Sequence, residues 1–448
     1  MIPAESFQTA SLRAAPQGEA ITRILAATIQ AVEPGAAVQR FVQRTGDRLV
    51  ISGRTYDLTA FGHVVLLGIG KASLAMSEAL ADILGERLDS NLVITKHVPT
   101  IRHSRLTILQ GDHPIPSTNS LLAGTKVIEL VSSLGPGDLF FCLISGGGSA
   151  LVTAPVEDVT LADLQSLTSV LLACGAGIEE INSLRRRLER VKGGGIVSLA
   201  NGATVVSLIL SDVVGNPLEA IASGPTVPDP TKRAEALSIL SRYSLEKQIP
   251  ASIYQVLRSS PETPKPGDPL FEKVQNVIVG SNLLAAQEAL KQAEEEGFHP
   301  YLLRTDLQGE AREAAFELAT LLRQIRQTGQ PVPVPACIVA GGETTVTVKG
   351  NGKGGRNTEL ALAAVSELAG FPGVMLVTLA TDGEDGPTDA AGAVVTGASH
   401  RRATEAGLHP GDFLERNDAY TFFAILDDLL KPGPTGTNVN DLTFLFTL

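Results

Sequence analysis

The chain has 448 residues, of which 44% are hydrophobic and 19% are charged, and its formal net charge is -12. This length exceeds one ordinary hydrophobic core and predicts two domains or three. The acidic balance argues against nucleic acid or an anionic membrane as the main partner, and the composition argues against wholesale disorder. An anionic substrate would therefore need a local basic pocket.

The cysteines and the first residues bear on the compartment. Cys142, Cys174 and Cys337 lie far apart and show none of the paired spacings of zinc sites or disulfide frameworks. The N-terminal stretch lacks the basic start and apolar run of a signal peptide, and no run approaches the roughly 18 to 20 apolar residues of a membrane span. We therefore predict a cytoplasmic protein that does not contact membranes.

Short apolar runs alternate with helical patterns along the first half of the chain, which predicts an α/β fold with a largely parallel sheet. The predicted strands cover residues 63–68, 91–95, 105–109, 139–144 and 203–210. The predicted helices cover residues 18–32, 72–84, 119–134, 161–173 and 178–192. These elements predict one open, doubly wound domain over residues 1–258.

The segment 259–269 reads "SSPETPKPGDP", and its prolines cannot continue a helix or a central strand. We expect it to be a linker to a smaller α/β domain over residues 270–448. The strands expected there cover residues 274–280, 301–304, 336–341, 344–350 and 373–380. The helices expected there cover residues 281–296, 310–326 and 357–369.

Five turns are rich in glycine, at residues 68–73, 145–150, 192–195, 341–343 and 350–357. Glycine lets a ligand approach the backbone, and consecutive amides can bind an anion. One such turn indicates only a tight connection, but five, two of them carrying a cation, favour an anion site at the carboxyl ends of strands. The candidate contacts for substrate or phosphate in the first half are Gly70, Ser145, Gly146, Gly147, Gly148 and Ser149.

The turn "GIGKAS" nearly matches two nucleotide-binding motifs. Ala72 follows Lys71 where a Walker A loop needs Ser or Thr, and Ser73 replaces the third glycine of a dinucleotide fingerprint. The acid expected about 20 residues on would be Asp89, which precedes the second strand instead of ending it. These departures weaken the prediction of NAD binding. Lys71, at a helix start, is still predicted to bind phosphate.

Two further positions in the first half are candidates. The helix 178–192 carries several arginines that read as a solvated basic face, but Lys192 precedes three glycines and is predicted to point into a cleft. Asp212 follows strand 203–210, and a carboxylate at a strand's carboxyl end suits a base or a metal ligand. A simple turn cap is the other reading of Asp212.

In the second half, Glu343, Lys353 and Arg356 come from "GGETTVTVKGNGKGGRN", and Arg356 would bind an anion together with its helix dipole. Asn438, on a turn before the closing strand, is a further polar candidate.

The loop "TDGEDGPTDAAGA" holds an acidic group that includes Asp382 and Asp385. Such acids repel one another unless a cation is near, so the loop implies Mg²⁺ or a surrounding arginine.

Taken together, these motifs resemble the glycerate 2-kinases of the MOFRL type, also called class II glycerate kinases. The resemblance rests on "GIGKAS", "GDHPIP", "LISGGGSAL", "INSLRRRLERVKGGG", "LILSDVVGNPLEAIASGPT", "GGETTVTVKGNGKGGRNTELALA", "TDGEDGPTDAAGA" and "GPTGTNVNDL". It implies phosphorylation of D-glycerate to 2-phosphoglycerate with ATP and Mg²⁺, in a cleft between a Rossmann-like N-terminal domain and a smaller C-terminal domain. It also implies that Lys71, Asp212 and Arg356 are catalytic.

The charges are consistent with such a reaction, because phosphoryl transfer mainly requires positioning and neutralisation. The candidate cations are Lys71, Lys192, Lys353 and Arg356, and the candidate Mg²⁺ ligands are Asp212, Asp382 and Asp385. Asp212 could be base or metal ligand, and the loop 146–149 could hold glycerate or an ATP phosphate. A hydroxypyruvate reductase using NAD(P)H and a non-catalytic sensor are the alternative functions. A monomer and a homodimer both stay open.

Overall fold

The computed structural model describes residues 2–98 and 105–448. The chain forms two compact units. The continuous unit is Pro34–Val279, and the discontinuous unit joins the segment that ends at Glu33 to Gly280–Leu448. This division differs from the predicted boundaries at both ends of the first domain. The prediction of an α/β protein is confirmed.

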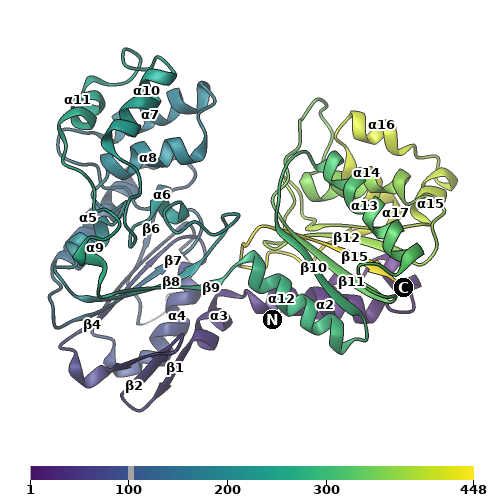
Figure 1. Cartoon of the computed structure of the whole chain (residues 1–448), viewed down its shortest axis with the longest axis horizontal. Coiled ribbons are helices and arrows are strands. Elements are labelled where there is room, and N and C mark those ends of the chain that lie inside the picture. Colours follow the sequence, from purple (N-terminus) through teal and green to yellow (C-terminus); the bar gives the residue numbers. More distant parts are fainter. Residues whose placement is uncertain (1, 99–104) are drawn as a thin grey trace. The chain divides into compact units, whose positions relative to one another are not determined.

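The continuous unit is built on a six-stranded sheet of order β6-β5-β4-β7-β8-β9 (Figure 1). Its strands are β4 (Val64–Ile69), β5 (Ser90–Thr95), β6 (Ile108–Gln110), β7 (Leu139–Ile144), β8 (Thr204–Leu210) and β9 (Val274–Gly280). Neighbouring strands from β6 to β8 are parallel. Every residue of β4 and β7 is buried, as expected for parallel strands covered on both faces. The chain order reverses between β4 and β7, and ligands of such sheets bind beyond the carboxyl ends at that point.

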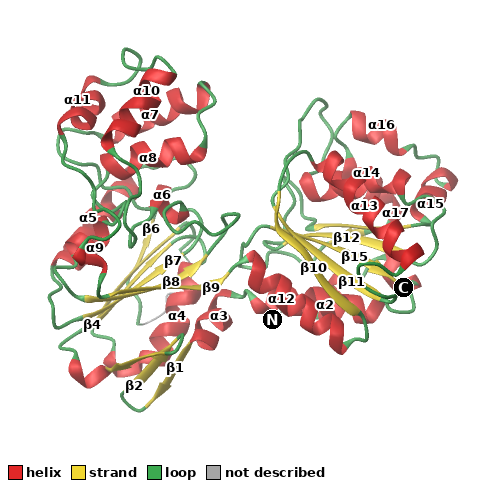
Figure 2. Cartoon of the chain, in the orientation of Figure 1, coloured by secondary structure: helices red, strands yellow, loops and turns green. Residues whose placement is uncertain are grey.

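Helices and one small sheet complete the continuous unit (Figure 2). The helices are α3 (Pro34–Phe41), α4 (Ser73–Leu84), α5 (Thr118–Ser132), α6 (Gly148–Leu151), α7 (Leu161–Ala173), α8 (Ile178–Leu188), α9 (Gly195–Leu199), α10 (Arg233–Arg242) and α11 (Ala251–Ser259). The antiparallel strands β1 (Val42–Thr45), β2 (Arg48–Ile51) and β3 (Arg54–Asp57) form the small sheet. Helices α7, α8, α10 and α11 enclose an apolar cluster of their own, separate from the core of the large sheet.

The discontinuous unit contains a mixed sheet of order β10-β11-β15-β12-β13-β14. Its strands are β10 (His299–Leu307), β11 (Ala336–Gly342), β12 (Val374–Ala380), β13 (Gly392–Thr396), β14 (Leu429–Leu430) and β15 (Asp441–Thr447). The last strand, β15, lies between β11 and β12 and is antiparallel to both. The helices are α1 (Ala10–Ala14), α2 (Gly18–Ala31), α12 (Asn282–Glu295), α13 (Ala311–Thr328), α14 (Arg356–Glu367), α15 (Ser399–Glu405), α16 (Pro410–Glu415) and α17 (Ala419–Leu426).

The N-terminal helix α2 packs against α12, which comes much later in the chain, and both helices belong to the discontinuous unit (Figure 1). Arg23 forms a double hydrogen bond with Glu296, with both N···O distances 2.7 Å. The buried hydroxyl of Thr437 donates to the carbonyl of Val32 at 2.6 Å. The predicted helix 18–32 is therefore present, but its assignment to the first domain is wrong, because an amphipathic pattern identifies an apolar face and not the partner of that face.

The predicted linker 259–269 lies inside the continuous unit, before β9 of the same sheet. Asp229 fixes it: its carboxylate accepts from the Thr263 hydroxyl at 2.7 Å, and its N–H donates to the Pro264 carbonyl at 2.9 Å. The prolines do exclude regular structure, yet the segment is packed and not a free connection. The strand expected at 344–350 is also wrong, since only Thr345 forms an isolated bridge there.

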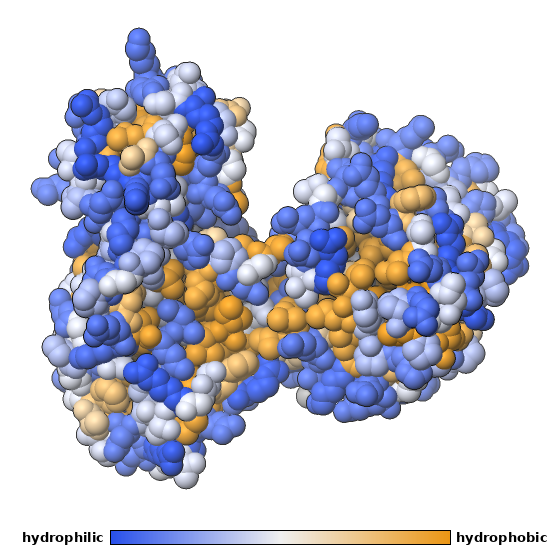
Figure 3. Space-filling view, in the orientation of Figure 1, coloured by the Kyte–Doolittle hydropathy of each residue, from blue (hydrophilic) through white to orange (hydrophobic). Residues whose placement is uncertain are grey.

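In the part of the chain that the structure describes, no helix is both long and apolar enough to cross a membrane. On the face seen in Figure 3, hydrophilic residues are mixed with apolar patches on the surface of each unit.

Candidate active site

Two glycine turns lie side by side where the strand order reverses. Gly70 follows β4 with a φ of 132°, and a Cβ there would stand 2.2 Å from the Oγ of Ser145. The N–H of Lys71 donates to the carbonyl of Gly146 at 3.0 Å, and the N–H of Ala72 donates to Ser145 Oγ at 3.0 Å. Glycine is therefore required at position 70, because Ser145 of the other turn approaches its backbone closely. The buried side chain of Ser145 joins the two turns instead of facing a ligand.

The side chain of Lys71 lies across Gly147. A Cβ on Gly147, whose φ is 84°, would be 3.3 Å from both Cγ and Cε of Lys71 and 3.1 Å from Cδ2 of His113. Burial, together with the charges of Lys71 and Lys96, lowers the pKa of His113 to about 4. His113 is therefore uncharged at neutral pH, and Lys71 supplies a positive charge beside the loop.

Asp212 lies on the other side of the same loop. It comes two residues after the end of β8, and a Cβ on Gly146 would stand 2.0 Å from its Oδ2. The loop thus places a carboxylate against Gly146 and a cation against Gly147. Four predicted site residues, Lys71, Gly146, Gly147 and Asp212, are brought together here.

A cavity of about 530 Å³ opens at this loop. Gly147, Gly148, Ser149 and Asp212 are the predicted residues that line it. His113, Asn182 and Arg185 also line it, and the sequence reading assigned none of them to the site. His113 lies in the motif "GDHPIP", and Asn182 and Arg185 lie in the basic helix, so both segments had been noticed in the sequence. Helical periodicity could not show which arginine faces the cavity.

The arginines of α8 have different roles. Arg186 and Arg187 are buried, with N···O distances of 2.8 Å to Asp229 and 2.9 Å to Glu262 respectively. Both arginines therefore stabilise the fold, and the interpretation of this helix as a basic face exposed to solvent is wrong for them. Arg185 lines the cavity, donates to Thr168 Oγ1 at 3.5 Å, and forms none of the ion pairs found among the described residues. Burial lowers the pKa of Arg185, against the opposing charge of Glu189.

Lys192 does not line the cavity. It is buried, its Nζ pairs with Glu189, and it donates to the carbonyl of Ser149 at 2.8 Å. Burial lowers the pKa of Lys192, and the negative charge of Glu189 opposes this shift. The structure therefore places Lys192 behind the loop, as a support for Ser149, where the sequence predicted a cation pointing into a cleft.

Arg356 and Glu343 line a second cavity, of about 750 Å³, in the discontinuous unit. Arg356 begins α14 and donates to the carboxylates of Asp441 and Glu343. Burial raises the pKa of Asp441 to about 6, although the hydrogen bond from Arg356 acts in the opposite direction. Burial alone would lower the pKa of Arg356, but Asp441 outweighs it and the net shift is upward. An incoming anion would have to compete with these two carboxylates.

Asp385 lines this cavity but is used by the protein itself. Its carboxylate accepts from the N–H groups of Asn357 and Thr358, at 2.9 and 2.8 Å, and from the Thr358 hydroxyl at 2.7 Å. It therefore caps the first turn of α14, where a negative charge is favourable. Across residues 2–98 and 105–448, no group of three or more His, Cys, Asp or Glu side chains is arranged to hold a metal ion.

The remaining candidates of this unit lie as follows. Asp382 and Asn438 line the cavity, and Asn438 Oδ1 accepts from the N–H of Asn440 at 3.0 Å. Lys353 Nζ instead lies 3.9 Å from the centre of the Tyr420 ring, in a cation–π contact. Lys353 is not among the residues that line the cavity.

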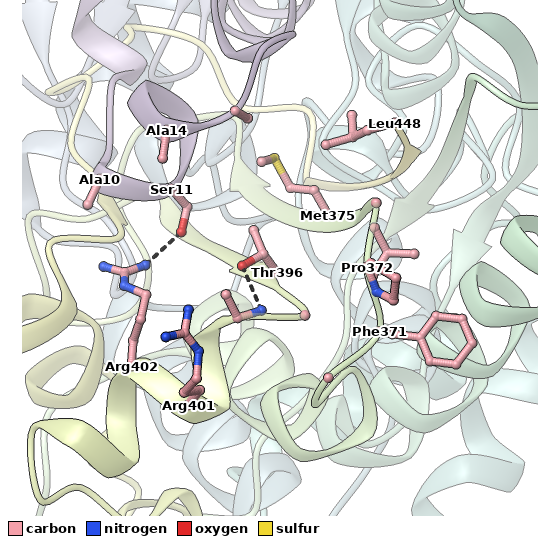
Figure 4. Close-up of a pocket in the computed structure, with 16 residues that line it drawn as sticks. Ala10, Ser11, Ala14, Phe371, Pro372, Met375, Thr396, Arg401, Arg402 and Leu448 are labelled. Carbon is pink, nitrogen blue, oxygen red and sulfur yellow. Dashed lines mark hydrogen bonds between the residues drawn. The ribbon is translucent and has the colours of Figure 1, made fainter.

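Another pocket of this unit, about 520 Å³ in volume, is shown in Figure 4. Its lining comes from α1 and Ala15, the chain from Gly370 to Met375, the chain from Thr396 to Ala398, α15 and Leu448. Arg402 points to Ser11, to which it donates at 2.8 Å, and it also pairs with the buried Asp428. None of the predicted site residues lines this pocket.

Comparisons with known proteins connect these sites to a family. Residues 20–258 match the domain of unknown function DUF4147, and residues 336–441 match the MOFRL family. The glycerate 2-kinase of Pyrococcus horikoshii is 36% identical and covers 94% of this chain and 95% of its own length. The D-glycerate 2-kinase of Thermotoga maritima is 41% identical, over 85% of this chain and 89% of that protein. The chain belongs to the MOFRL-type glycerate 2-kinase family.

Solved structures agree with this membership. The crystal structure of glycerate kinase from Thermotoga maritima matches with a TM-score of 0.87 at 38% identity and covers 96% of this chain and 99% of that one. The family resemblance predicted from the sequence is confirmed, and the chain falls among the glycerate kinase enzymes. A relative from Agrobacterium vitis, 41% identical over 85% of this chain and 86% of its own length, is named a putative hydroxypyruvate reductase.

Proposed function

We propose that the protein phosphorylates D-glycerate at the 2-hydroxyl with ATP, giving 2-phosphoglycerate and ADP. The hydroxyl oxygen bonds to the γ-phosphorus, the bond from that phosphorus to the β,γ-bridging oxygen breaks, and the hydroxyl proton leaves to a base. The observation that carries the proposal is the placement of Asp212 and Lys71 against the adjacent glycines Gly146 and Gly147. A carboxylate and a cation on one glycine loop are what a phosphoryl transfer needs.

Within the continuous unit, each group has a role in this proposal. The backbone of Gly147 to Ser149 lines the cavity and binds phosphate oxygens, and Lys71 neutralises their charge. Asp212 either accepts the hydroxyl proton or holds Mg²⁺. The strand order 3-2-1-4-5-6, counted along the chain, supports a Rossmann-like fold with its ligand at the reversal point.

Asp212 fits a magnesium site of the usual kinase kind, in which one or two carboxylates and the substrate phosphates share the ion. Such an ion would neutralise charge that develops on the phosphate oxygens. Asp385 does not fit, because its oxygens already accept from the start of α14. We therefore assign no role in metal binding to Asp385.

We further propose that Arg356 binds a substrate anion through its guanidinium, which is fixed in place by Asp441 and Glu343. Turnover should then depend on residues of both units, Lys71 and Asp212 in one and Arg356 in the other.

The test is an assay of ADP formation with ATP, Mg²⁺ and D-glycerate, followed by phosphorus NMR of the product. We expect ADP and 2-phosphoglycerate in equal amounts. A 3-phosphoglycerate product would contradict the position of transfer, and the absence of ADP would contradict the kinase.

The second candidate is the reductase, which is supported by the name of one relative and by the Gly68–Gly70 turn. The position of Asp89 argues against it. Its carboxylate accepts from the N–H of Val64 at 2.7 Å, at the amino end of β4, whereas Gly70 follows the carboxyl end. Asp89 therefore lies at the wrong edge of the sheet to bind the ribose of a dinucleotide. Oxidation of NADH or NADPH in the presence of hydroxypyruvate would reinstate the reductase.

A further inference from the structure

We propose that the cavity of the continuous unit is the nucleotide site, with the nucleobase held by the aliphatic side chains of Ile115, Leu172 and Ile178 and the phosphates directed to Gly147–Ser149. This inference rests on the proposed function. What it adds is the assignment of ATP, and not glycerate, to this cavity.

The cavity is bordered by an apolar rim, a name we give to Ile115, Leu172 and Ile178. These side chains come from the loop before α5, the last turn of α7 and the start of α8, and all three line the same cavity. They are 67%, 64% and 63% exposed, respectively. Aliphatic surface that is left in water at a cavity gains free energy when a ligand covers it. The carbons of glycerate all bear oxygen, so glycerate offers no apolar face for this rim, whereas a nucleobase offers two.

The size of the cavity also favours a nucleotide. The cavity volume of about 530 Å³ falls within the range of roughly 300 to 1,000 Å³ that is typical of sites for larger organic ligands. Glycerate would leave most of this volume to water. A nucleotide would extend from the apolar rim to the glycine loop.

The charged groups at the cavity agree with this assignment. Arg185 lines the cavity, and the one side-chain hydrogen bond that it forms among the described residues is the 3.5 Å contact with Thr168. Lys71 is not itself a lining residue, but its side chain lies against Gly147, which is. Two cations in the same site suit a polyphosphate. The hydroxyls of Thr168 and Ser169, which also line the cavity, donate to the carbonyls of Leu164 and Gln165 in their own helix. Contact with the base would therefore be mainly apolar.

The experiment measures ADP affinity by calorimetry on the full chain, together with the KM for D-glycerate. Leu172→Ala and Ile178→Ala should each weaken ADP binding about fivefold, the effect of losing part of one aliphatic contact. The KM for D-glycerate should change less than about twofold. Because both side chains are largely exposed, the fold should be retained. Leu122→Ala is the matched control, since Leu122 lies on α5, is 53% exposed and does not line the cavity.

Rim variants that bind ADP like the wild type, or that raise the KM for D-glycerate instead, would overturn the assignment. The two proposals can fail separately. If the wild type forms ADP from ATP and D-glycerate while the rim variants bind ADP normally, only the nucleotide assignment fails. If the wild type neither binds ADP nor forms it, the proposed function fails and the assignment fails with it.

Discussion

The carboxylate of Asp212 occupies the space beside Gly146 that any larger residue would need. A Cβ on Gly146 would lie 2.0 Å from Oδ2 and 2.7 Å from Cγ of Asp212. Contacts that short do not occur, so the Asp212 carboxylate could not keep this position if a larger residue replaced Gly146. The site is therefore defined as much by a missing side chain as by the groups that are present.

Gly146→Ala should displace Asp212 and lower turnover by about a hundredfold or more, because a catalytic group moved by 1 Å can cost that much. The measurement is the rate of ADP formation at saturating ATP and D-glycerate. Gly137→Ala is the control, because a Cβ there meets no described atom within 4 Å. A Gly146→Ala enzyme with a normal rate would remove Asp212 from the reaction.

Arg356→Ala should lower turnover by at least about two orders of magnitude, the usual cost of removing a donor that stabilises charge in the transition state. Arg356→Lys should recover little, because an ammonium group cannot donate to Asp441 and Glu343 as a fork. The control is Arg323→Ala, which removes a peripheral pair with Glu367 at 3.5 Å in the same unit. Near-normal rates in Arg356→Ala would place the anion site elsewhere.

Lys192→Met should lower the free energy of unfolding by about 3 to 5 kcal/mol, because it leaves the carboxylate of Glu189 buried without a counter-charge. Adding Glu189→Gln should restore much of that loss. Thermal or denaturant unfolding gives the stability, and the kinase assay gives the activity. If the Lys192→Met, Glu189→Gln double variant is folded but has no kinase activity, then Lys192 contacts a substrate, as the sequence predicted.

Lys71→Met should raise the pKa of His113, because a positive charge that disfavours protonation is removed. The shift can be followed by NMR titration from the wild-type value of about 4. An unchanged pKa would show that Lys71 does not lie beside His113 in solution.

The same pKa has a consequence for stability. The His113 pKa is about 4 in the folded chain and ordinarily 6.5, so the unfolded chain binds the proton more tightly. Stability should therefore fall as the pH decreases from about 6.5 to about 4, and less steeply in Lys71→Met.

Elements with strong local signals were predictable from sequence. The strand predicted at 139–144 and the helix predicted at 161–173 have the same bounds as β7 and α7. An uninterrupted apolar run specifies a buried parallel strand, and the capping pair Thr160–Asp163 marks the start of the helix. The position of β15 between β11 and β12 was not predictable, because it depends on which strands meet in space.

The site shows the same limit. The apolar runs identify the strands, and therefore their ends, so the positions of the glycine turns, Lys71 and Asp212 at those ends could be predicted. The burial of Lys192 depends on Glu189, which lies three residues earlier, in the segment that follows α8. This pair could have been recognised from the helix predicted at 178–192, in which the same spacing brings side chains together, although α8 ends at Leu188. The cap formed by Asp385 could not, because Asp385 lies 28 residues after Asn357. Local spacing predicts which groups are available, and long-range packing decides which of them face a ligand.

The packing of α2 on α12 has a consequence for how the chain is made. Synthesis releases the residues up to Glu33 first, but their partners begin only at Gly280, after the whole of Pro34–Val279 has left the ribosome. Domains generally fold as units during synthesis, so the continuous unit can fold before α12 has been made. Until then the apolar face of α2 lacks its partner and is accessible to chaperones. The segment that ends at Glu33 is thus synthesised before the continuous unit but can complete its packing only after that unit has been made.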